Sequence, residues 1–254
     1  GEWNPDITLW DTSAVTDMNY MFFDTHFNEN IGGWDVSSVT DMSHMFGDAR
    51  VFNQDLSAWD VGSVTNMNSM FYDTLFNQNI GGWDVSSVTD MSYMFYSIAD
   101  FNQNLNSWNV SNVQNMQAMF GFCLNYNQPM NLWNVGSVTN MSSMFIDCFD
   151  FNQDIGAWNV SNVTNMSSMF QGARTFNQDI SSWNMGSVTD MSFMFGGSTV
   201  FNQDIGGWNV GSVTTMRGTF SGADAFNQDI GGWNVSNVTD MANMFRNTFA
   251  FNQD

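Results

Sequence analysis

The sequence predicts a β-rich repeat solenoid made of stacked coils of 24–25 residues. A tryptophan recurs at this spacing from Trp10 to Trp233. A whole unit repeats with it, as FNQDLSAWDVGSVTNMNSMF at 52–71 and FNQDIGAWNVSNVTNMSSMF at 151–170 show. One such unit cannot bury its apolar face alone, so neighbouring units must stack. We therefore expect one array of ten repeats over residues 1–254, with the start of an eleventh, inside a longer protein or fibre.

The first part of each unit is typical of a short parallel strand. In Trp34-Asp35-Val36 and again in Ser38-Val39-Thr40, apolar and polar side chains alternate, which is the period of a strand. Ser37 lies between the two triplets, and glycine takes its place in several other units. This exchange predicts a tight corner at that position.

The second part of each unit predicts a short helix or 3₁₀ turn. Met42, Met45 and Phe46 have the i, i+3, i+4 spacing of one helical face, and Asp41 before them suits an N-cap. The chain then returns through a variable loop to the next aromatic residue, Phe52.

Two recurring residue types are expected to hold the stack together. Tryptophan should form a buried core column, and the asparagine that follows each aromatic start should form an inward ladder that satisfies backbone groups from coil to coil. The core column comprises Trp34, Trp59, Trp83, Trp108, Trp133, Trp158, Trp183, Trp208 and Trp233. The ladder comprises Asn28, Asn53, Asn77, Asn102, Asn127, Asn152, Asn177, Asn202 and Asn227.

The charge of the chain excludes several classes of partner. There are 25 acidic residues against four arginines and no lysine, which gives a formal net charge of −21. Such a surface repels phosphate backbones and anionic lipid heads, so we expect no nucleic-acid binding. No apolar run approaches the roughly 18–20 residues that span a bilayer, so we expect no membrane insertion in this segment.

The unit FNQNIGGWDVSSVTDMSYMF at 76–95 resembles the BspA-type leucine-rich-repeat superfamily. It is most similar to the 25-residue surface-protein repeat of unknown function of mycoplasmas, other bacteria, protists and algae. The resemblance covers the whole chain and implies leucine-rich-repeat-like coils on secreted or cell-surface proteins, some of which bind host matrix proteins. It supplies no catalytic residues. The fifth and sixth units depart most from the pattern, at Gln114 and at Pro129-Met130.

The two cysteines predict a disulfide. Cys123 and Cys148 occupy the same position of adjacent units, and stacked positions about 4.8 Å apart are within the Cα range that a disulfide accepts. The extracellular location that the resemblance implies favours this pairing. The alternative is that both are small buried residues, because Ala49 and Ala173 stand at equivalent positions.

Two further sets of residues allow modification or metal binding. Sequons for N-glycosylation occur at Asn109, Asn140, Asn159, Asn162, Asn165, Asn234 and Asn237, although the repeat itself generates them. Stacked carboxylates at Asp154, Asp179, Asp204 and Asp229 are weak candidates for calcium, of millimolar affinity at most, and the alternative is a solvated acidic face. No other metal or cofactor is expected.

The sequence thus predicts a non-catalytic extracellular surface or fibre-forming scaffold that presents periodic faces for adhesion or self-assembly. Its partners would be neighbouring copies end to end, or an extracellular protein or glycan. No nucleophile, base and acid converge in the repeat, and the two histidines, His26 and His44, hold different positions of their units. The alternatives are an ice-binding solenoid, through Ser/Asn-Val-Thr ladders, and a calcium-binding structural repeat.

Overall fold

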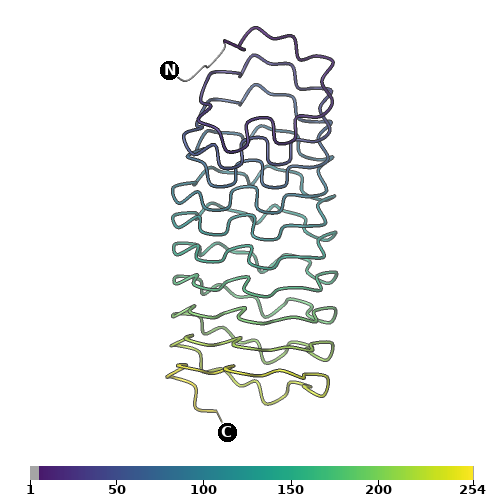
Figure 1. Ribbon diagram of the computed structural model, residues 1–254. Helices are drawn as coiled ribbons and strands as arrows, with labels where there is room; N and C mark the ends of the chain where they lie inside the picture. Colours follow the sequence, from purple (N-terminus) through teal and green to yellow (C-terminus); the bar gives the residue numbers. More distant parts are fainter. Residues whose placement is uncertain (1–5, 254) are drawn as a thin grey trace.

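The chain folds into a stack of coils that run one above another from the first repeat to the last. A computed structural model describes residues 6–253, and Figure 1 shows the coils as successive layers with the first and the last coil at opposite ends of the stack. We number the coils 1 to 10, so that coil 2 is 27–51 and coil 6 is 126–150. Trp3, the expected start of the first repeat, lies outside the described residues, and so does Asp254, the last residue of the eleventh repeat, which begins at Phe251.

The predicted strand and helix of each coil are wrong, and the stack is not a β-rich solenoid. Within residues 6–253 no helix forms, and the only β structure is a row of isolated parallel bridges, one residue to each coil. The bridges join Asp17 to Asp41, Asp41 to Asn66 and so on to Asp240. Each coil is therefore almost entirely turns and bends that are held in register by their neighbours.

A helix is excluded because two residues of every coil have left-handed backbone. His44 and Asp48 have φ of 54° and 57°, and the equivalent residues of the other coils share this conformation. As a result alternate N–H groups point out of the coil: those of Met42 and His44 donate to the carbonyls of Asn66 and Asn68 in the next coil, at 3.0 and 2.8 Å. In a helix they would bond within the segment. The i, i+3, i+4 spacing comes from consecutive turns.

The expected strand is interrupted by a turn at its centre. The N–H of Val39 donates to the carbonyl of Val36 at 2.9 Å, and this turn reverses the chain at Ser37. Only the N–H of Thr40 then reaches the previous coil, where it donates to Thr16 at 2.8 Å. A single backbone hydrogen bond to the previous coil, next to a turn, is too few to make a strand.

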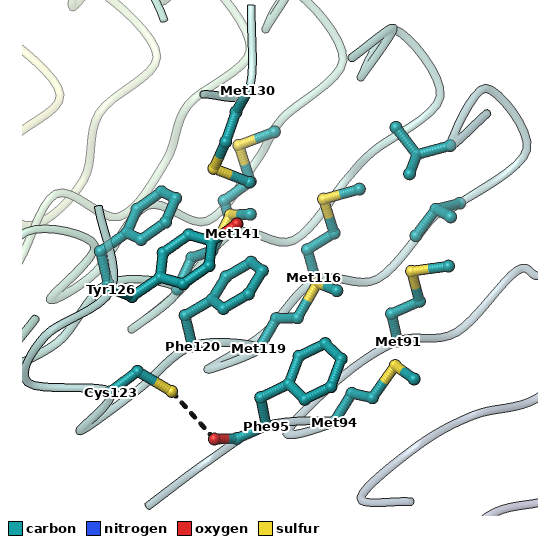
Figure 2. Packing of buried hydrophobic residues seen from close by; sticks show 14 of the residues in the cluster. Met91, Met94, Phe95, Met116, Met119, Phe120, Cys123, Tyr126, Met130 and Met141 are labelled. Atoms are coloured by element: carbon teal, nitrogen blue, oxygen red, sulfur yellow. Dashed lines mark hydrogen bonds between the residues drawn. The ribbon is translucent and has the colours of Figure 1, made fainter. Parts of the chain in front are cut away.

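The core consists of apolar columns that run along the stack. Met42, Met45 and Phe46 are completely buried, and Phe46 lies parallel to Phe71 of the next coil with ring centroids 5.7 Å apart. Figure 2 shows how the methionine and phenylalanine side chains of successive coils repeat at equivalent places. Burial of a phenylalanine or methionine side chain contributes about 1.5–3 kcal/mol, so hydrophobic packing between coils stabilises the stack.

Candidate functional site: the variable edge of the coil stack

The tryptophan column is buried and joins coils that are adjacent in the stack. Trp59 is 4% exposed, and its indole N–H donates to the carbonyl of Ile31 at 3.1 Å. The same bond recurs from Trp34 through Trp233, so each indole has a polar partner in the coil before it. This column therefore has a structural role.

The asparagine ladder also links the coils, but it runs along the surface and not inside the stack as expected. The Oδ1 atom of Asn28 accepts the backbone N–H of Asn53 at 2.9 Å and the side-chain amide of Gln54 at 3.1 Å. Asn28 and Asn53 are both exposed. The pattern continues to Asn252. From Gln54 onward, the glutamine that follows the asparagine is a second part of the ladder, which sequence reasoning did not assign.

Cys123 and Cys148 are buried free thiols, so the predicted disulfide is not formed in this structure. Their Sγ atoms donate to the carbonyls of Phe95 and Phe120, at 3.0 and 2.8 Å, and Figure 2 shows the first of these bonds. Ser198 makes the same bond to Phe170. The thiols thus behave as small buried donors, and burial raises the pKa of both well above the ordinary value.

The candidate calcium column is a row of exposed carboxylates, each of which closes a local turn. Asp154 and Asp179 accept the backbone N–H of Gly156 and Ser181, at 3.0 and 2.9 Å, and Asp204 and Asp229 do the same. The bonds from Ser181 lower the pKa of Asp179. Over residues 6–253 no three acidic, histidine or cysteine side chains are grouped closely enough to hold a metal ion.

The sequons differ in whether their amide nitrogens are engaged. Asn162 and Asn237 each donate from Nδ2 to a carbonyl of the preceding coil at 2.7 Å. A glycan at either nitrogen would break that bond. Asn109, Asn159 and Asn234 are exposed and accept a turn N–H through Oδ1. Asn140 and Asn165 are half-buried on the row of bridges.

The Ser/Asn and Thr ladders are also used to join coils. Thr40 and Thr65 donate from Oγ1 to the carbonyls of Thr16 and Thr40, both at 3.1 Å. Ser87 donates to Gly62 at 2.8 Å in the parallel column. These hydroxyl hydrogens are therefore committed to neighbouring backbone, although the oxygens remain accessible.

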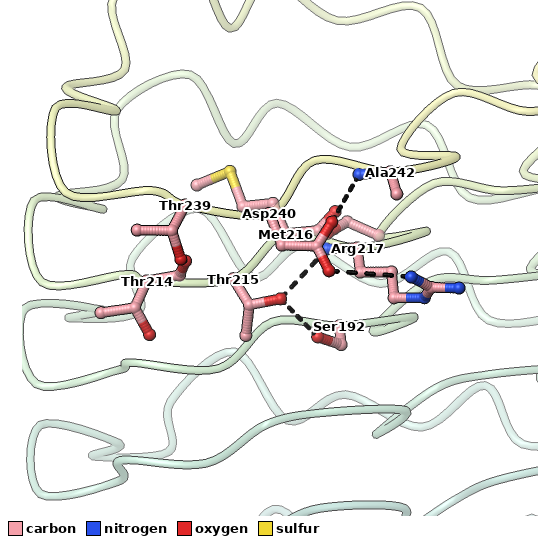
Figure 3. A network of polar contacts seen from close by, with 9 residues as sticks. Ser192, Thr214, Thr215, Met216, Arg217, Thr239, Asp240 and Ala242 are labelled. Atoms are coloured by element: carbon pink, nitrogen blue, oxygen red, sulfur yellow. Dashed lines mark hydrogen bonds and ion pairs between the residues drawn. The ribbon is translucent and has the colours of Figure 1, made fainter.

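The residues predicted as N-caps close turns. In coil 2 the Oδ1 of Asp41 accepts the N–H of Ser43 at 2.8 Å, although no helix follows. Coil 9 has Thr215 at this place, and Figure 3 shows its hydroxyl between Ser192 and the N–H of Arg217. The guanidinium of Arg217 then lies 3.7 Å from Asp240 of coil 10. This network keeps the register where the repeat departs from Asp or Asn.

The side chains on one edge of the stack vary from coil to coil, whereas those of the tryptophan, asparagine and threonine columns stay nearly constant. We call it the variable edge and define it by the two left-handed positions of each coil and the residue before the second, which in coil 2 are His44, Gly47 and Asp48. Serine, glycine, tyrosine, phenylalanine and aspartate all occur at these positions. The coil forms with many different side chains at these positions, so the variable edge is the best candidate for recognition of a partner.

Aromatic side chains gather on the variable edge of the first five coils. Tyr72 and Tyr96 lie parallel with centroids 5.1 Å apart, and Tyr96 also contacts Tyr93 and Phe122 edge-on or tilted. In coils 1 and 2, Tyr20 stacks on His44 at 4.4 Å. Four of the five tyrosines of the chain therefore share this edge, and burial against the neighbouring coils raises the pKa of Tyr72 and Tyr96.

Sequence reasoning missed this edge because it assigned these positions to a helix and a loop. A signal was present: Gly172, Gly197 and Gly222 occupy the second left-handed position of coils 7 to 9, and Gly218 the first of coil 9. Glycine at the same place of several repeats indicates positive φ. Tyrosine, histidine, alanine and aspartate at the equivalent places of other coils concealed it.

The fold and its surface define a repeat scaffold, in which the constant columns build the stack and one edge is free to vary. The chain belongs to the family described as Mycoplasma protein of unknown function, DUF285, whose repeats match residues 1–104, 73–183 and 148–254. No curated protein matches the chain. Over the described residues there is no helix of the length and apolar character needed to cross a membrane.

Proposed function

We propose that the chain is a non-catalytic extracellular surface or fibre-forming scaffold, whose variable edge provides adhesion. The observation that supports this function is that the constant columns hold the coils together, whereas the variable edge does not have one fixed set of side chains. The tryptophan indoles, asparagine amides and threonine hydroxyls are engaged in bonds between coils. The edge that carries Tyr72 and Tyr96, in contrast, differs from coil to coil in its side chains. Many weak contacts along such an edge would add up to firm attachment.

Self-assembly has its own support in the polarity of the contact between coils. Met42, His44, Phe46 and their equivalents donate N–H groups toward the following coil, whereas Thr40 donates toward the preceding one. A stack that ended at coil 10 would expose N–H groups of Met241 and Phe245, and a stack that began at coil 1 would expose the matching carbonyls of Asp17 and Met21. Two such ends complement each other as adjacent coils do, and a head-to-tail contact of this kind continues into a filament.

An adhesion assay tests the function. Beads that carry the chain should bind immobilised extracellular matrix proteins, and beads with a chain whose variable edge is reduced to serine at Tyr20, Tyr72 and Tyr96 should not. A second variant with serine at the exposed constant positions Thr139, Thr164 and Thr189 provides the control. Equal adhesion of all three chains would contradict the assignment of recognition to the edge.

The two rival functions have less support. In the ladders expected to bind ice, the Oγ1 hydrogens of Thr40 and Thr65 are donated to backbone carbonyls. In the column expected to bind calcium, each carboxylate already closes a turn. Thermal hysteresis in the first case, and micromolar calcium affinity lost in Asp179→Asn/Asp204→Asn in the second, would favour these functions over adhesion.

A further inference from the structure

The most distinctive surface of the variable edge is a group of tyrosines and aspartates on coils 2 to 4. Asp48 belongs to coil 2, Tyr72 and Asp73 to coil 3, and Tyr96 to coil 4. We call these four residues the tyrosine–aspartate strip. Asp48 and Asp73 have side chains that are 24% and 32% exposed, so the carboxylates are accessible but partly shielded from water.

Part of the ring surface of the strip is already covered. Tyr72 and Tyr96 are stacked at an interplanar angle of 3°. Beyond Tyr96 comes Gly121 of coil 5, where a Cβ atom would lie 2.8 Å from the Tyr96 ring. A sugar ring packs its C–H groups on an open aromatic face, whose π cloud is negative. The Tyr72–Tyr96 stack and the approach of Gly121 to Tyr96 reduce the open aromatic face that a neutral glycan would need.

A cation already occupies part of the strip. The guanidinium of Arg50 lies 3.4 Å from Oδ1 of Asp48 and 3.1 Å from Oδ2 of Asp73, and thereby bridges two coils. The Arg50 side chain is 73% exposed, and the two surface ion pairs that hold it are weak because water screens exposed charges. The pair of carboxylates is thus spaced to accept a guanidinium, and its present occupant is weakly held.

A hollow of about 310 Å³ adjoins Asp73 and Arg50 and has room for a long side chain. Its lining includes Arg50, Asp73, Leu75, Ser97 and Asp100. Leu75 is 63% exposed, which gives an apolar surface beside the acids. Lysine and arginine combine an apolar stem with a charged head and fit such a combination.

We propose that the tyrosine–aspartate strip and its hollow dock a lysine- or arginine-rich segment of a partner protein. This inference rests on the proposed adhesive function and names the chemistry of the partner. The net charge of −21 would draw a basic partner toward the chain from a distance, and the strip would then give it a defined place. The partner's cationic group would take the place of Arg50 between Asp48 and Asp73, with its stem against Leu75 and the tyrosine edges.

Calorimetry with a nine-residue arginine peptide tests the proposal. Asp48→Asn/Asp73→Asn should weaken binding about tenfold, as expected when two charge-assisted contacts are lost. Asparagine suits the left-handed backbone there, since Asn247 holds the same position in coil 10. The control Asp204→Asn/Asp229→Asn makes the same change of charge on another face and should weaken binding less than twofold. Tyr72→Ser should weaken it about threefold, and Ser221 shows that the stack accepts serine at that position.

The variant Arg50→Ala gives the sharpest result, because it removes the internal competitor. Binding of the arginine peptide should strengthen about threefold, whereas the control Arg217→Ala, with the same change of charge, should leave it nearly unchanged. Equal weakening by the two aspartate pairs, weaker binding by Arg50→Ala, or binding of an N-acetylglucosamine tetramer that depends on Tyr72 but not on Asp48 would overturn the proposal. Adhesion that persists without peptide binding would overturn this inference and leave the proposed function standing.

Discussion

Tyr126 is a core residue whose buried hydroxyl group destabilises the fold. It stands in the aromatic column in place of phenylalanine, packs on Phe120 at 4.2 Å, and is completely buried. Its hydroxyl is the single buried side-chain N or O atom of residues 6–253 with no hydrogen-bond partner. Figure 2 shows the ring among Phe120, Met130 and Met141, which offer no polar group to the oxygen except sulfur. Burial also raises the pKa of Tyr126 well above its ordinary value.

Tyr126→Phe should therefore stabilise the chain. A buried hydroxyl without a partner costs about 1–3 kcal/mol, and phenylalanine has the same shape without that cost. For a chain of this size 1 kcal/mol raises the unfolding midpoint by roughly 2–4 °C, so we expect a rise of about 2–12 °C, measured by calorimetry.

The reverse change at a neighbouring coil provides the control. Phe151→Tyr places a second hydroxyl in the same column and should lower the midpoint by a similar amount. A midpoint for Tyr126→Phe equal to or below that of the parent chain would refute the reasoning, because it would show that the hydroxyl is bonded.

Four further predictions follow from the same contacts. Trp133→Ala should cost about 3–5 kcal/mol, whereas the exposed Thr139→Ala should cost no more than about 1.5, because it removes one hydrogen bond between coils; urea unfolding measures both, and similar costs would mean that inward and outward positions are misassigned. Ser168→Gly should stabilise by up to about 1 kcal/mol because φ at Ser168 is 56°, while Gly172→Ala should destabilise because its Cβ would collide with the Asp147 carboxylate; thermal midpoints compare the two. Burial raises the pKa of the Cys123 and Cys148 thiols above the ordinary 9.0, so above about pH 9 each thiol ionises only in the unfolded state. The free energy of unfolding should be constant below about pH 9 and fall above it by up to about 1.4 kcal/mol per pH unit for each thiol. This loss should shrink in Cys123→Ala/Cys148→Ala and would be absent if the thiols were accessible. Light scattering should show end-to-end association that increases above ~0.1 M salt, where charge repulsion is screened within about 10 Å, and a monomer at every salt concentration would argue against self-assembly.

The sequence predicted the stacking, its period and its core, because burial follows from which positions are always apolar. Trp59, Val64 and Phe71 had to face inward together whatever the backbone did. It did not predict the local conformation, because consecutive turns and a single helical turn both place apolar residues at i, i+3 and i+4. The deciding property was the sign of φ at His44 and Asp48, and only the glycines of coils 7 to 9 indicated it. Once a helix was assumed, Tyr72 and Tyr96 could not be placed side by side.

Residue-by-residue amide hydrogen exchange tests most directly whether alternate N–H groups of each coil donate to the next coil. This backbone conformation is what places the variable edge at the surface. In the structure the N–H groups of Met141 and Ser143 donate to Asn165 and Ser167 of the next coil, at 3.0 and 2.8 Å. Both amides should be strongly protected. In a helix capped by Asn140 they would belong to the first turn, whose N–H groups have no partner within the helix. Rapid exchange of Met141 and Ser143, with protection only from Met144 onward, would contradict the stack of turns.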